Sequence, residues 1–126
     1  MHALIIEDEF LTALTLEDLL LELGVETCDW AATEAAAIDA AARHTPDLIA
    51  ANIQLRYGDS VEAVREICEE REIPTILVSA TDVLLRDEVD NAVIVAKPLC
   101  EHKFRLAFEQ VCGRKAEPAV EIEFYS

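Results

Sequence analysis

The chain has 126 residues, of which 52% are hydrophobic and 29% are charged, a balance typical of one globular domain with its own core. Its formal net charge of −16, from 26 acidic and 10 basic residues, repels phosphate backbones and anionic membranes, so we do not expect nucleic-acid or membrane binding. No signal peptide is recognisable and no apolar run approaches the ~18 residues of a membrane span, so a cytoplasmic protein is expected.

Short apolar runs alternate with segments of helical periodicity through most of the chain. The runs are near-continuously apolar, which is typical of parallel strands buried on both faces and joined by right-handed crossovers. The predicted strands are residues 3–6, 25–31, 48–52, 75–79 and 92–96. The predicted helices are residues 10–23, 34–43, 60–70 and 100–112, and a shortened fourth helix is expected over 81–91, before the last of these.

The first predicted helix is the richest in large apolar side chains. They recur at helical spacing, as expected of a helix that packs on a sheet. The apolar positions of this helix are Phe10, Leu11, Leu14, Leu16, Leu19, Leu20 and Leu23.

Polar side chains follow the apolar runs at the point where four of the predicted strands end. They are Glu7 and Asp8, Asn52, Ser79, and Lys97. Because the carboxyl ends of parallel strands meet at one edge of the sheet, we expect these side chains to lie together. Two carboxylates can hold Mg²⁺, while an ammonium and a hydroxyl can meet the oxygens of a phosphoryl group.

Four short motifs in the same order resemble the receiver domain of two-component response regulators. They are LIIEDE (4–9), PDLIAANIQL (46–55), ILVSA (76–80) and AKP (96–98). In detail the chain is most similar to the receiver part of alphaproteobacterial general-stress response regulators. The resemblance covers residues 1–113 and implies an α/β, flavodoxin-like, doubly wound sheet of strand order 2-1-3-4-5. Residues 114–126 would then be a flexible tail or an added edge strand.

The resemblance also implies a role for each residue at the strand ends. Glu7 and Asp8 correspond to the acidic metal-binding pair, and Asn52 falls at the phosphoacceptor position, where it would also face the metal. Gln54 would supply a backbone carbonyl to the metal. Ser79 corresponds to the switch hydroxyl, and Lys97 to the site lysine of the family, which contacts the phosphoryl group. Pro98 follows a peptide bond that is often cis in the family.

Asn52 is the main departure from the family pattern. An amide is neutral and poorly nucleophilic, so it cannot form the acyl phosphate that a carboxylate forms. It also removes one negative charge from the metal site, so we expect Mg²⁺ binding to be weak or absent. Asn52 could be natural, as in a pseudo-receiver, or an engineered replacement of aspartate. Asp47 and Asp59 do not match the acceptor position and are poor substitutes.

Ile94, three residues before Lys97, is the second departure. Receiver domains typically have an aromatic residue there, and its rotation couples to the switch hydroxyl. An aliphatic side chain at this coupling position cannot signal in that way. The short segment 81–91 lies where the family's output surface lies, so that surface is expected to be remodelled.

The leading hypothesis is a stand-alone receiver domain, not an enzyme, that acts in a phosphorelay through protein binding. Expected partners are a histidine kinase, a histidine phosphotransfer protein or an anti-sigma-type regulator, with the domain a monomer or weak dimer. The alternatives are a normal phosphoreceiver with an engineered Asp-to-Asn change, or a Mg²⁺-dependent phosphohydrolase with Asp8 as nucleophile. The phosphohydrolase is less favoured because Phe10 replaces its second carboxylate. A flavin-binding module is weaker still, because the loop after the first strand is acidic.

Overall fold

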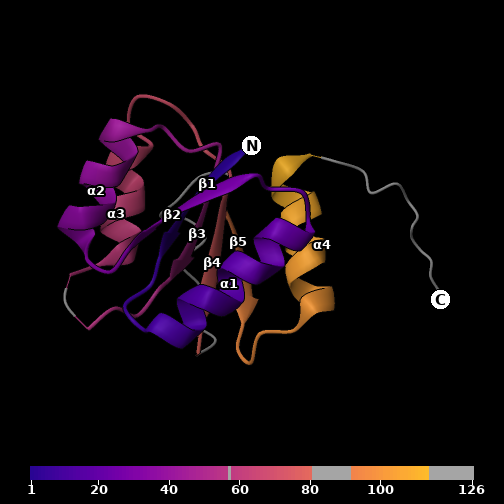
Figure 1. Ribbon diagram of the computed structural model, residues 1–126. Coiled ribbons are helices and arrows are strands. Elements are labelled where there is room, and N and C mark those ends of the chain that lie inside the picture. Colours follow the sequence, from indigo (N-terminus) through magenta and orange to yellow (C-terminus); the bar gives the residue numbers. More distant parts are fainter. Residues whose placement is uncertain (57, 81–91, 114–126) are drawn as a thin grey trace.

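A five-stranded parallel sheet forms the centre of the molecule (Figure 1). The computed structural model describes residues 1–56, 58–80 and 92–113. The strand order β2-β1-β3-β4-β5 confirms the predicted flavodoxin-like topology. The strands are β1 (His2–Ile6), β2 (Thr27–Ala31), β3 (Leu48–Asn52), β4 (Thr75–Ser79) and β5 (Ala92–Ala96).

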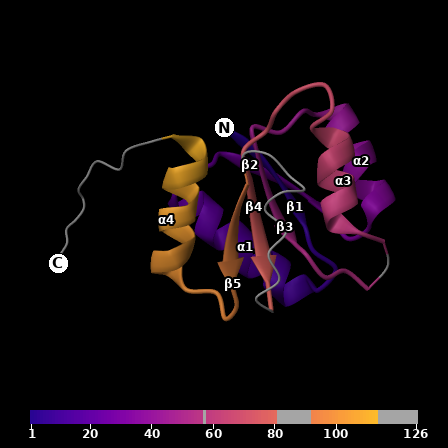
Figure 2. The same ribbon diagram turned by 180° about the vertical axis from the view of Figure 1, so that it is seen from behind.

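Of the helices in the described part of the chain, two cover each face of the sheet. Figures 1 and 2 show α1 and α4 on one face and α2 and α3 on the other. Among the described residues, no helix combines the length and apolar character that spanning a membrane requires. The helices are α1 (Phe10–Glu22), α2 (Glu34–Arg43), α3 (Ser60–Ile67) and α4 (Glu101–Cys112). The predicted shortened helix over 81–91 and the predicted tail over 114–126 lie outside the described residues.

The alternation of side chains along each strand divides the core into two layers. In β1, Ala3 and Ile5 pack in the cluster beneath α1 and α4, whereas Leu4 and Ile6 pack in the cluster beneath α2 and α3. All five residues of β1 are buried, and the same holds for β3 and β4. Burial on both faces explains why these strands read as continuous apolar runs.

Local signals in the sequence set several of the helix ends. The side chain of Thr33 accepts a hydrogen bond from the backbone of Ala36 at the start of α2, as predicted. Gly113 ends α4 in the left-handed conformation, which glycine adopts without strain. Helix α3 ends at Ile67, three residues earlier than predicted, because the chain turns there to bring Ile73 into the core, where it is 2% exposed.

The loop between β3 and α3 is fixed by close contact with the start of α2. Gly58 has a φ of +91°, and a Cβ on it would lie 2.9 Å from the Cβ of Glu34. The Glu34 carboxylate accepts a hydrogen bond from the backbone N–H of Asp59, and the Asp59 side chain in turn caps α3. These contacts hold in place the segment that follows Asn52.

Candidate functional site

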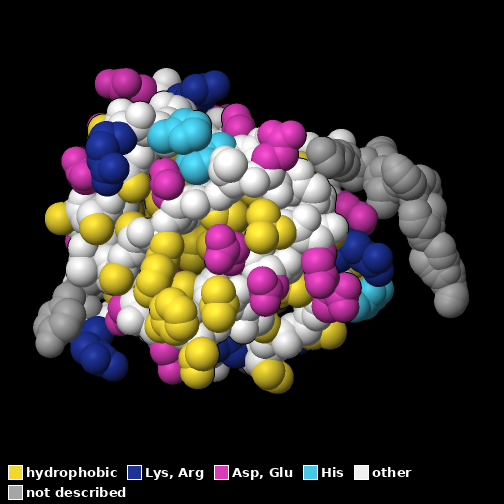
Figure 3. Space-filling model, viewed as in Figure 1, with side chains coloured by type: hydrophobic (Ala, Val, Ile, Leu, Met, Phe, Trp, Pro, Cys, Tyr) yellow, Lys and Arg dark blue, Asp and Glu magenta, His cyan; other side chains and the backbone are white. Residues whose placement is uncertain are grey.

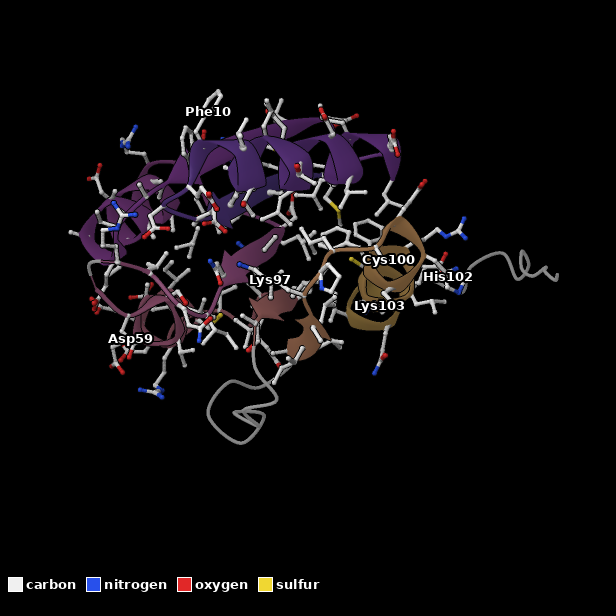
Figure 4. The ribbon with its side chains drawn as sticks, turned by 90° about the horizontal axis from the view of Figure 1, so that it is seen from below. Phe10, Asp59, Lys97, Cys100, His102 and Lys103 are labelled. Atoms are coloured by element: carbon white, nitrogen blue, oxygen red, sulfur yellow. The ribbon has the colours of Figure 1, made fainter. Side chains whose placement is uncertain are left out.

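The carboxyl ends of β1, β3, β4 and β5 meet at one edge of the sheet, as the sequence predicts. Figure 4 looks onto this edge and shows Lys97 extending from the end of β5 toward the neighbouring strand ends. Glu7 follows β1, while Asn52 and Ser79 are the last residues of β3 and β4. Four of the predicted site residues therefore lie at the ends of neighbouring strands.

Glu7 is the buried carboxylate of the site, with only 1% of its surface exposed. Its Oε2 accepts hydrogen bonds from the backbone N–H of Glu9 at 3.0 Å and from the side-chain amide of Asn52 at 3.3 Å. Its Oε1 is buried without a hydrogen-bond partner among the described residues. Burial raises the pKa of Glu7, whereas the hydrogen bonds and the positive charge of Lys97 oppose the increase. Glu7 thus lies where a positively charged ligand would stabilise it.

Asn52 is tied into the site through both ends of its amide. Its Nδ2 donates to Glu7 Oε2, and its Oδ1 accepts from the backbone N–H of Gln54 at 3.3 Å. Only 5% of Asn52 is exposed. An aspartate here would place a second carboxylate against Glu7, a repulsive arrangement unless a cation or proton separates the two. The amide instead donates to Glu7 and removes this conflict.

Asp8, the second residue of the predicted acidic pair, is partly exposed and faces the loop after β3. Its Oδ2 accepts a hydrogen bond from the backbone N–H of Arg56. The same loop is anchored to the following helix, since the hydroxyl of Ser60 donates to the carbonyl of Ile53 at 3.1 Å. The loop that carries Gln54 is therefore held against Asp8 through Arg56.

The ends of β4 and β5 are joined by backbone pairing. Lys97 donates its backbone N–H to the carbonyl of Ser79 at 2.8 Å, and Ser79 is fully buried. The Lys97–Pro98 bond is cis, as the resemblance implied. Ile94 is partly buried in the core layer beneath α2 and α3, and in the sheet register it pairs with Leu77. That Ile94 does not couple to the Ser79 hydroxyl, as an aromatic residue would, stays a prediction.

The oxygen atoms at this edge fit a hard divalent cation such as Mg²⁺. The unpartnered Glu7 Oε1 and the Asp8 carboxylate are the ligand types that Mg²⁺ prefers. The amide nitrogen of Asn52, however, already uses one oxygen of Glu7. The donor set is therefore that of a magnesium site with one negative charge fewer than a site that has aspartate at position 52.

Helix α1 buries only part of its apolar surface against the sheet. Ala13, Leu16 and Leu20 face the core. A second helical stripe faces solvent, because a helix carrying this many apolar residues cannot direct all of them toward one sheet. The exposed fractions in this region are Phe10 59%, Leu11 70%, Leu14 41% and Leu21 44%, with Trp30 of β2 at 46%.

The exposed stripe of α1 continues onto β2. The rings of Phe10 and Trp30 lie 5.6 Å apart, and together with Leu14, Glu17 and Cys28 they line a shallow hollow. Figure 3 shows hydrophobic side chains gathered across this face of the molecule. The resemblance to receiver domains implies that a phosphotransfer helix docks against residues 10–23, but the hollow itself was not predicted, although the excess of leucine in α1 was a signal for it. We call this surface, formed by Phe10, Leu14 and Trp30, the α1 apolar patch.

Residues 3–104 match the family model of the response regulator receiver domain. The chain belongs to this family. Receiver domains act in two-component signalling and typically bind Mg²⁺ at an acidic pocket.

Several relatives connect this receiver domain to the PhyR response regulators. The receiver domain of PhyR from Erythrobacter litoralis is 33% identical, with a TM-score of 0.80 and 94% of each chain covered. PhyR from Methylorubrum extorquens is 37% identical over 99 residues, which cover 75% of this chain and 37% of that protein. The regulatory protein PdtaR from Mycobacterium tuberculosis is 33% identical over 72% of this chain and 43% of its own length. The receiver domain thus spans less than half of these two curated relatives.

One group of relatives contains an enzyme. The protein-glutamate methylesterase/protein-glutamine glutaminase of Halobacterium salinarum is 32% identical over 79 residues, but the match spans only 23% of that enzyme. So short a match does not extend the enzyme's activity to this receiver domain. The family acts mainly in signalling.

Proposed function

We propose that this receiver domain signals by binding protein partners and is not phosphorylated at residue 52. The observation that carries the proposal is Asn52, which stands at the end of β3 with its amide bonded to Glu7. Forming an acyl phosphate requires a carboxylate nucleophile, and the amide lacks one. The hydrogen bond to Glu7 also gives Asn52 a structural role that aspartate would not fill without a cation.

The two nearby aspartates in sequence support this proposal, because both are engaged elsewhere. Asp47 accepts a hydrogen bond from the backbone N–H of His2 at 2.8 Å, at the opposite edge of the sheet. Asp59 accepts from the backbone of Val61 and Glu62 and caps α3. Neither carboxylate is placed to act in place of residue 52.

The proposed phosphorylation state is tested with acetyl phosphate and intact-mass measurement. The unmodified chain is expected to gain no phosphoryl group, whereas Asn52→Asp is expected to gain one in the presence of Mg²⁺. The variant is the matched control, because it replaces only the side-chain amide of residue 52 with a carboxylate of the same shape. A phosphoryl group mapped to residue 52 of the unmodified chain would overturn the proposal. Failure of both proteins to react under conditions that label another receiver domain would show that the site is inactive for reasons beyond Asn52.

The α1 apolar patch is the proposed docking surface for a helical partner. It lies beside the carboxyl edge of the sheet, since Trp30 donates a hydrogen bond from its indole to the carbonyl of Glu7 at 2.6 Å. A histidine kinase or histidine phosphotransfer protein presents helices to receiver domains, and an apolar helix face suits this patch. The Bartonella quintana relative is described as the anti-anti-sigma factor PhyR, which makes an anti-sigma-type regulator a further candidate.

Disrupting the patch is expected to remove the partner. Leu14→Glu places a charge in the hollow and should lower the recovery of a histidine kinase, phosphotransfer protein or anti-sigma-type protein at least fivefold in a pull-down from source cells. Leu106→Glu is the matched control, because Leu106 lies on α4 and is 51% exposed. Equal recovery with both variants would exclude the patch as the docking surface while leaving the phosphorylation test unaffected.

A further inference from the structure

Two histidines and an aspartate meet at the amino edge of the sheet, opposite the edge that carries Glu7 and Asn52. His2 begins β1, Asp29 lies within β2, and His44 follows the last residue of α2. One ligand atom from each side chain lies within 4.8 Å of those of the other two. Figure 3 shows histidine side chains gathered near the top of this face, with acidic side chains beside them.

The fold explains why these three residues meet. His2 and Leu4 point to the same side of β1, and Leu4 packs beneath α2. His2 is paired in register with Thr27, two residues before Asp29 on the neighbouring strand. The ring of His44 stacks on that of His2, with centroids 3.7 Å apart and planes inclined by 10°.

The contacts of the His2 ring leave Nε2 free to act as a metal ligand when Nδ1 carries the proton. Its Nδ1 lies 2.7 Å from the hydroxyl of Thr27, and its Nε2 lies 3.1 Å from Oδ2 of Asp29. When Nδ1–H donates to Thr27, Nε2 and the Asp29 carboxylate face each other as two acceptors that a cation can bridge. Metal-binding histidines commonly use their second nitrogen in this way to fix the orientation of the ring.

We propose that His2, Asp29 and His44 form a binding site for a divalent transition metal ion of the zinc class. Two imidazoles and one carboxylate are a donor set that suits Zn²⁺, whereas Mg²⁺ prefers oxygen ligands alone. Ligands about 2.0–2.1 Å from a tetrahedral zinc ion lie about 3.3 Å apart. The 3.1 Å separation of His2 Nε2 and Asp29 Oδ2 is close to this value. Three protein ligands leave a fourth position for water.

Coordination requires the ring of His44 to turn out of the stacked arrangement, because parallel rings do not direct their lone pairs at one point. His44 is exposed, and among the described residues its ring makes the stacking contact and no hydrogen bond. Its backbone N–H donates to the carbonyl of Ala40, so the main chain keeps its place while the side chain turns. His2, 6% exposed, supplies the fixed ligand.

The charges around the cluster favour a cation. Asp47 lies beside His2, where it accepts the backbone N–H of that residue, and the whole chain carries a net charge of −16. Arg43, the nearest cationic side chain in sequence, is paired with Asp39 at 3.0 Å. The bound ion would join β1, the edge strand β2 and the end of α2.

The test uses the full chain and isothermal titration with Zn²⁺, in the presence of millimolar Mg²⁺ as a competitor at the acidic edge. We expect one Zn²⁺ to bind, with the affinity reduced at least tenfold by His44→Ala or Asp29→Asn. His102→Ala is the matched control, because His102 is an exposed histidine on α4, outside the cluster. Its affinity for Zn²⁺ should equal that of the unmodified chain.

Co²⁺ absorption provides a second readout. Intense visible bands of tetrahedral cobalt are expected with the unmodified chain and with His102→Ala, but not with His44→Ala. Equal Zn²⁺ affinity of the His44→Ala and unmodified chains would overturn the proposal, as would loss of binding in Asp8→Asn, which would place the ion at the acidic edge. In those cases the role of the cluster is structural: its hydrogen bonds join β1 to β2 and no metal ion is bound there. Neither outcome bears on phosphorylation of residue 52.

Discussion

Replacing Asn52 with aspartate is expected to raise the affinity for Mg²⁺ about a hundredfold. A carboxylate and a divalent cation 4 Å apart attract each other by about 8 kcal/mol at the effective dielectric constant of a protein surface, twice the value for two unit charges. Desolvation and the repulsion between the new carboxylate and Glu7 offset part of this gain. A remainder of about 2.7 kcal/mol corresponds to a hundredfold change in affinity.

Titration calorimetry with Mg²⁺ measures this change directly. The matched control is Gln110→Glu, which adds the same charge on an exposed side chain of α4, outside the site. It should change the affinity by less than a factor of three. Similar affinities for the unmodified chain and Asn52→Asp would show that the amide already serves the cation as well as a carboxylate does, and the expectation of weak Mg²⁺ binding would then be wrong.

Replacing Glu7 with glutamine is expected to stabilise the fold at neutral pH in metal-free buffer. Burial raises the pKa of Glu7 in the folded protein above its ordinary value of 4.5. The folded state therefore binds this proton more tightly than the unfolded state, and the contribution of Glu7 to stability falls as pH rises through the folded pKa. Glutamine carries no charge, so it avoids the cost of keeping an ionised carboxylate buried, which is the main cause of the raised pKa.

Urea unfolding at a series of pH values, with a chelator present, tests this expectation. The difference in unfolding free energy between Glu7→Gln and the unmodified chain should be small below pH 4.5 and should grow toward neutral pH. Glu22→Gln, on the exposed end of α1, makes the same change of charge and should show no such growth. A constant difference across pH would mean that Glu7 does not carry an uncompensated charge in the folded state.

The three central strands, β1, β3 and β4, were predictable from the sequence because they are buried on both faces. Continuous apolar runs such as residues 48–52 have few alternative structures, and the polar residue that ends each run indicates the shared edge. The hydrogen bond between Asn52 and Glu7 was not predictable, since it depends on the orientation of an amide that no pattern encodes. The end of α3 was misplaced because the turn that buries Ile73 is a tertiary effect.

The exposure of the α1 apolar patch and the histidine cluster were not predicted, for different physical reasons. The resemblance implies docking on residues 10–23, but periodicity identifies a helix and not how many of its apolar stripes the sheet can cover. The histidine cluster was hidden because His2, Asp29 and His44 are separated by many residues and come together only through strand pairing and the end of α2. Neither feature follows from spacing in the sequence.

Trp30 gives the molecule an internal optical reporter. It is the only tryptophan of the chain, its indole donates to the carbonyl of Glu7, and its ring lies half exposed beside Phe10. Its emission therefore responds both to events at the acidic strand ends and to contact with a docking helix. Shifts in the emission maximum and intensity of this one fluorophore can report cation and partner binding in real time, without any attached label.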